Sequence, residues 1–61
     1  MTTEAEPQVR KFCAELGDFR LMNESNRYNC RNMLAGFLQA CERLGCMTHD
    51  EAQTLFAELA G

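Results

Sequence analysis

The sequence predicts an all-α fold, a small three-helix bundle whose second helix is the longest. Three observations lead to this fold class. Apolar residues recur at spacings of three and four in three segments, a glycine follows two of these segments, and a capping box opens the third. The expected helices span about residues 7–16, 24–44 and 49–60, after a frayed segment 1–6. A chain of 61 residues lies near the lower limit for independent folding, so we expect one helical domain, 1–61.

The first helix is predicted from its two ends and from the pattern between them. Pro7 suits the first turn, where its missing N–H costs nothing, and Gly17 is a natural stop. Four apolar residues between them form one face: Val9, Phe12, Cys13 and Leu16.

Residues 18–24 are compatible with two conformations. They could form a loop or a short extra turn of helix. In both cases we expect Phe19, Leu21 and Met22 to be buried against the bundle.

The middle helix begins near Asn23 or Ser25, because both are good N-cap residues. An apolar stripe with the period of an α-helix follows: Cys30, Met33, Leu34, Phe37, Leu38, Cys41 and Leu44. Asn23, Asn26 and Arg27 continue the stripe toward the N-terminus, so the inward face becomes polar before Cys30.

The segment Leu44–Glu51 predicts a sharp reversal of the chain. Gly45 ends the middle helix, and Thr48 with Glu51 forms a capping box that begins the next one. The third helix folds back antiparallel, with its inner face formed by Ala52, Leu55, Phe56 and Leu59. Because this helix is short, we expect it to cover the stripe only from about Cys30 onward. In general pattern the segment 45–59 resembles small helical proteins of bacteria and their phages, a resemblance that implies no functional residue.

The composition limits the compartment and the partners. No apolar run approaches the roughly 18 residues of a membrane span, and the first six residues lack the pattern of a signal peptide. We therefore expect a cytoplasmic protein with reduced cysteines and no membrane partner. The net charge of −3 argues against nucleic-acid binding by bulk electrostatics. Residues 10–43 nevertheless hold all six basic residues and only four acidic ones, a net charge of +2.

Catalytic and metal sites find little support in the sequence. Cys41, Cys46 and His49 surround the reversal, but their spacing matches no zinc module, so we interpret the cysteines as small apolar residues. No phosphate-binding loop, HExxH motif or nucleophile elbow occurs. The expectation is a protein that is not an enzyme and has no metal or cofactor.

The segment 20–32 is rich in arginine and asparagine and contains the only tyrosine. Tyr28 falls opposite the apolar stripe, in line with Asn32, Ala35 and Gln39. It could face solvent as an anchor for a partner, or pack on the first helix or on Phe19. The segment itself could be the solvated end of a long helix or a recognition patch. The residues of this predicted partner-binding patch are Arg20, Asn23, Arg27, Tyr28, Arg31 and Asn32.

Gly36 and Ala40 form a second, small flank of the middle helix. Glycine inside a helix costs about 0.5–1 kcal/mol relative to alanine, so it suggests a close backbone approach. The neighbour could be the first helix, which we favour, or the middle helix of a second copy. A small core also favours a homodimer or an obligate partner.

These observations favour a small protein-binding module that regulates or inhibits a larger protein, in a setting such as a phage or another mobile element. The alternative is a nucleic-acid-associated regulator that contacts phosphates through Arg20, Arg27 and Arg31, with Lys11 as a further candidate contact.

Overall fold

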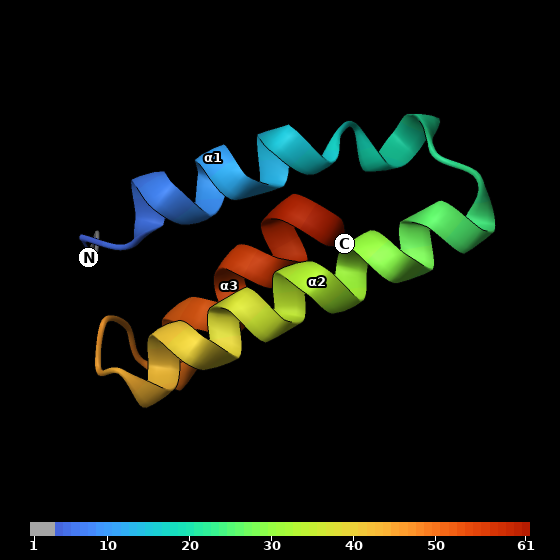
Figure 1. The fold of residues 1–61 in the computed structure, drawn as a ribbon. Coiled ribbons are helices and arrows are strands. Elements are labelled where there is room, and N and C mark those ends of the chain that lie inside the picture. Colours follow the sequence, from blue (N-terminus) through green and yellow to red (C-terminus); the bar gives the residue numbers. More distant parts are fainter. Residues whose placement is uncertain (1–3) are drawn as a thin grey trace.

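The computed structural model describes residues 4–61. They form α1 (Glu6–Leu16), a short 3-10 helix η1 (Phe19–Leu21), α2 (Glu24–Arg43) and α3 (His49–Ala60), with no strand in this range. The chain is an all-α three-helix bundle, as predicted. α2 is the central element: α1 runs antiparallel along it, and α3 folds back along it on another side (Figure 1). No helix within these residues is both long and apolar enough to cross a membrane.

Side-chain caps fix the starts of α2 and α3 at the residues that the sequence indicates. The Asn23 side chain accepts a hydrogen bond from the backbone N–H of Asn26 at 2.8 Å. Thr48 and Glu51 form the reciprocal capping box: the Glu51 N–H donates to Thr48 Oγ1 at 3.2 Å, and the Thr48 N–H donates to Glu51 Oε1 at 2.8 Å. Met47, just before the cap, is buried in the core and thereby fixes the direction in which the chain enters α3.

Gly45 ends α2 through a Schellman motif. Its φ of +78° lies in the left-handed region, which is accessible to glycine without strain. The Cys46 N–H donates to the Cys41 carbonyl at 2.8 Å, and the Gly45 N–H donates to the Glu42 carbonyl at 3.0 Å. These bonds satisfy carbonyls that the helix end leaves free, so the reversal is built from local chemistry alone.

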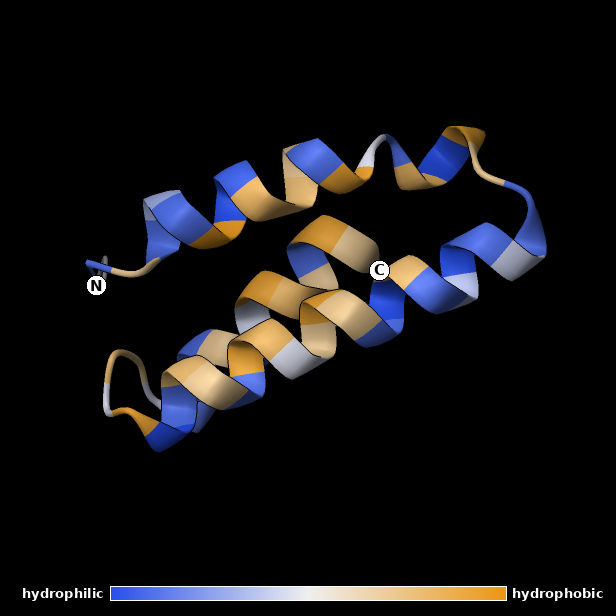
Figure 2. Cartoon of the chain, in the orientation of Figure 1, coloured by the Kyte–Doolittle hydropathy of each residue, from blue (hydrophilic) through white to orange (hydrophobic). Residues whose placement is uncertain are grey.

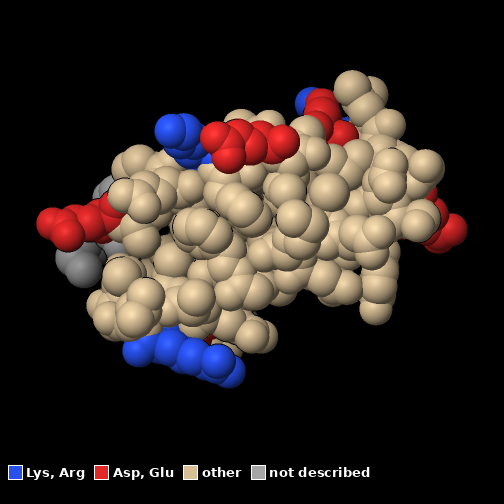
Figure 3. Space-filling model, in the orientation of Figure 1, with Lys and Arg blue, Asp and Glu red and all other residues tan. Residues whose placement is uncertain are grey.

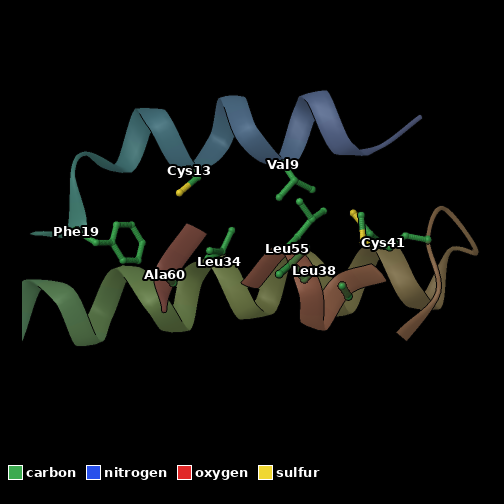
Figure 4. Close-up of a cluster of buried hydrophobic side chains, with 10 residues drawn as sticks. Val9, Cys13, Phe19, Leu34, Leu38, Cys41, Leu55 and Ala60 are labelled. Carbon is green, nitrogen blue, oxygen red and sulfur yellow. The ribbon is translucent and has the colours of Figure 1, made fainter. Parts of the chain in front are cut away.

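The core lies where the three helices meet. Val9 of α1 and Leu34 of α2 are completely buried, and Figure 4 shows α1 side chains directed toward α2 and α3. The buried apolar residues are Val9, Cys13, Phe19, Leu34, Leu38, Cys41, Met47, Ala52, Leu55 and Ala60. The first turns of α2 are hydrophilic and the rest of the helix is mostly apolar (Figure 2), which agrees with the change of polarity before Cys30.

Three residues that we expected to be buried are exposed. Leu21 in the η1 turn is 84% exposed, and Met33 and Leu44 on the α2 stripe are 52% and 79% exposed. The burial of Leu21 was predicted wrongly because the 3-10 turn directs Phe19, not Leu21, into the core. Met33 and Leu44 lie at the edge of a stripe that is wider than α1 and α3 can cover.

The predicted contact between Gly36 and the first helix is also wrong. A Cβ placed on Gly36 would meet no atom within 4 Å, and both Gly36 and Ala40 are exposed. α1 instead packs beside Phe37, whose ring stacks on Phe12 with centroids 4.7 Å apart. Among residues 4–61, Gly36 therefore has no close neighbour that accounts for it.

Candidate protein-binding groove

The residues predicted to bind a partner divide into two groups, and the first is used inside the chain. The Arg20 guanidinium pairs with Asp18 at 3.1 Å, and the Arg20 backbone N–H donates to the same carboxylate at 2.9 Å. The side-chain hydrogen bond from Arg20 is the main cause that lowers the pKa of Asp18, followed by the backbone bond. Both groups are exposed, so this pair orders the turn at the surface.

Arg27 and Asn23 hold the segment between α1 and α2 in place. Asn23 caps α2, as described above. The half-buried Arg27 donates from Nε to the Phe19 carbonyl at 3.1 Å and from Nη2 to the Met22 carbonyl at 2.9 Å. Its guanidinium thus satisfies two backbone acceptors of the η1 turn, and charged donors make such bonds stronger than neutral ones.

The second group faces solvent on the side of α2 that adjoins α3. Tyr28 is 67% exposed, which agrees with an outward tyrosine and not with one packed on α1 or Phe19. The Arg31 guanidinium carbon lies 5.8 Å from the centroid of the Phe56 ring, within the range of a cation–π contact. A shallow hollow is lined here by Glu24, Arg27, Tyr28, Arg31, Asn32, Ala35 and Phe56.

A second hollow continues from the first toward the chain reversal. The two share Ala35 and Phe56, and the second has a volume of about 330 Å³. Its lining is mainly apolar and consists of Ala35, Leu38, Gln39, Glu42, His49, Ala52, Gln53 and Phe56. We call the two together the α2–α3 groove. The middle of the groove is apolar, and Arg31 lies at one end. At the other end, a hydrogen bond of 2.8 Å joins His49 Nδ1 and Glu42 Oε1.

The sequence analysis predicted only part of this groove. Phe56 was placed on the inner face of its helix, but its contact with Arg31 joins residues 25 positions apart in the chain. The sequence places Gln39 in line with Tyr28 on one side of the middle helix, but nothing local to Gln39 or Glu42 indicates a groove. The packing of α3 against α2 supplies the second wall of the groove, which the pattern of α2 alone cannot show.

The basic residues do not form a continuous phosphate-binding surface. Arg10 is bonded to Glu6 and Glu58, which links α1 to α3, and Arg20 and Arg27 are occupied by Asp18 and by backbone carbonyls. Of the three arginines predicted to contact phosphates, Arg31 is the one that makes no hydrogen bond or ion pair with any residue from 4 to 61.

The cysteines lie apart from the groove. Cys13 and Cys41 are buried, Cys30 is half-buried and Cys46 is exposed, and all four are free thiols. Burial is the main cause that raises the pKa of Cys13 and of Cys41. Among the described residues, no three His, Cys, Asp or Glu side chains gather where they could hold a metal ion.

The chain was compared with known proteins. It matches no protein-family model, no curated protein sequence and no solved structure.

Proposed function

We propose that this chain is a small protein-binding module that regulates or inhibits a larger protein by binding it through the α2–α3 groove. The observation that carries the proposal is the cluster of Tyr28, Arg31 and Phe56 at the open end of the groove. Tyrosine and arginine are the residue types most often found to dominate the energy of protein interfaces.

Arg31 is suited to recognition because its position is already restricted in the free protein. Its guanidinium lies over the Phe56 ring and has donors that no other described side chain uses. A side chain ordered before binding loses less conformational entropy when the complex forms. The same reasoning sets Arg27 apart, because its donors already satisfy two carbonyls of the η1 turn.

The chemistry of the groove favours a partner surface with one carboxylate and one apolar side chain. A carboxylate can accept two parallel hydrogen bonds from the fork of Arg31. The apolar side chain would enter the hollow between Ala35 and Ala52, where the lining is mainly apolar. An amphipathic helix that lies along the groove could supply both groups from a single face.

A nucleic-acid-binding function receives less support. It would need several arginines free to contact phosphates along one surface, whereas Arg20 and Arg27 are engaged within the chain. The net charge of −3 also opposes binding to the anionic phosphate backbone. We therefore propose the protein-binding function alone.

The test is capture of a partner from the native host by the tagged protein, followed by mass spectrometry and a binding titration. We expect Arg31→Gln to weaken binding by roughly 30-fold or more, the effect of a dominant interface arginine worth about 2 kcal/mol. Tyr28→Ala should weaken binding to a similar extent. Neither change should lower the melting temperature appreciably, because both side chains are exposed.

Arg43→Gln is the matched control. It removes the same charge from an exposed position on the same helix, but it lies outside the groove. Equal capture by all four proteins would contradict the assignment of the groove. A bait that retains no protein specifically would contradict the proposed function as a whole.

A further inference from the structure

The side of α2 that faces away from the α2–α3 groove has no charged residue along its whole length. α2 contains five charged residues: Glu24, Arg27, Arg31, Glu42 and Arg43. With 3.6 residues per turn, all five fall within an arc of about 160° around the helix axis. The remaining arc includes the exposed residues Met33, Gly36 and Ala40.

This arc and the adjoining side of α1 form one continuous surface. The half-buried rings of Phe12 and Phe37 stack at its centre, and Met33 lies one turn from Phe37 on the same side of α2. Figure 3 shows this side of the molecule, where charged groups lie only at the rim. We call it the uncharged face, with the residues Phe12, Met33, Gly36, Phe37, Ala40 and Leu44.

Two of the four exposed large hydrophobic residues of the described chain lie on the uncharged face. Met33 is 52% exposed and Leu44 is 79% exposed, while only Val9 and Leu34 are completely buried in the core. The accessible surface is 4420 Å² for a chain of 6.9 kDa, whereas a compact protein of this mass has about 4000 Å². The accessible surface is thus about a tenth larger than the average for this mass.

We propose that two copies of this chain associate through the uncharged face, with the α2 helices crossing near Gly36. In a two-fold dimer each residue near the axis meets its own copy, so a charged surface would repel itself. This face has no charge to repel. Gly36 has open space in front of it, and at a crossing its missing side chain would let the second helix approach closely.

The available area fits a weak, reversible dimer. The backbone measures 33 × 17 × 16 Å. One long side thus has a plane area of about 560 Å². Because this is less than the about 800 Å² per partner of a standard interface, we expect the dimer to dissociate on dilution. A larger unrelated partner would be expected to use charged groups for specificity, and the face offers none.

The dimer is independent of the proposed function, because the two surfaces lie on opposite sides of α2. Each copy would keep its α2–α3 groove exposed, so that one dimer presents two partner sites. A failure of partner capture therefore leaves the dimer intact, and a monomeric protein can still bind a partner through the groove.

The test is the molecular mass of the full chain in solution, measured by light scattering and sedimentation over a range of concentrations. We expect a species of twice 6.9 kDa that dissociates on dilution. Met33→Glu places two like charges near the two-fold axis and should weaken dimerisation at least tenfold, with unchanged helicity by circular dichroism. Leu44→Lys is a second variant at an even more exposed position.

Two further variants make the result specific. Thr54→Glu adds the same charge on the exposed side of α3 and should leave the dimer intact. Gly36→Ala should raise the melting temperature of the monomer, because alanine favours the helix and meets no atom there, while it weakens the dimer. A wild-type protein that stays monomeric at every concentration, or a dimer that Arg31→Gln dissociates and Met33→Glu does not, would overturn the proposal.

Discussion

The two sides of α2 differ in how their exposed residues are held. On the groove side, Arg27 is bonded to the η1 turn and Arg31 lies over the Phe56 ring. On the uncharged face, Met33 and Leu44 are exposed, and a Cβ placed on Gly36 would meet no other part of the described chain within 4 Å. Exposed residues on the two sides of α2 therefore favour different kinds of association. Polar exposed groups already restricted by the fold favour selective recognition, whereas exposed apolar groups without contacts favour burial by association.

The largest expected effect tests the core on which both sides depend. Leu34 is completely buried among all three helices, so Leu34→Ala should destabilise the protein by about 2–5 kcal/mol. That loss is comparable with the about 3–5 kcal/mol that a core of this size supplies, so the variant should be largely unfolded. Circular dichroism with urea titration would measure this.

Leu21→Ala is the matched control for the core. It removes the same atoms at a position that is 84% exposed, and we expect a change within about 0.5 kcal/mol. Similar losses in the two variants would show that Leu34 does not carry the packing that the structure assigns to it.

A smaller effect separates two arginines that lie one turn apart. Arg27→Met should lower the free energy of unfolding by about 1–3 kcal/mol, because two carbonyls of the η1 turn lose charged donors. Arg31→Met should leave stability nearly unchanged, since methionine can still cover the Phe56 ring. Thermal unfolding of the two variants side by side would measure the difference. Equal stability would contradict the division between a structural and a binding arginine.

The sequence predicted best those features that depend on adjacent residues. Gly45, Thr48 and Glu51 define the reversal within one short segment, and Asn23 caps α2 through a residue only three positions away. The buried residues of α1 also follow from a single helical period. In each case the groups that satisfy the backbone, or share a face, are close in the chain.

Features that depend on how the helices are placed could not be predicted in this way. The period of α2 assigns Met33 and Leu44 to the apolar stripe, but their burial depends on where α1 and α3 lie around that stripe. The acceptors of Arg27 exist only once residues 18–22 have turned. The contact of Arg31 with Phe56 requires the whole reversal between α2 and α3. Each of these features is set by tertiary packing, which the apolar period of a single helix does not predict.

The smallest expected effect concerns the turn that Arg27 holds, and it depends on pH. The hydrogen bonds from Arg20 lower the pKa of Asp18, so the ionised carboxylate is favoured by folding. The stability that this pair contributes is therefore present above the ordinary Asp pKa and is lost as the pH falls through the lowered value. An NMR titration that follows the Arg20 amide should give a midpoint below that of an unpaired Asp. Asp18→Asn should abolish this transition while the signals of Tyr28 and Met33, on the two sides of α2, stay the same as in the wild-type protein. A midpoint at the ordinary value would show that the Asp18–Arg20 pair does not persist in solution, and would leave Arg27 as the principal polar anchor of the turn.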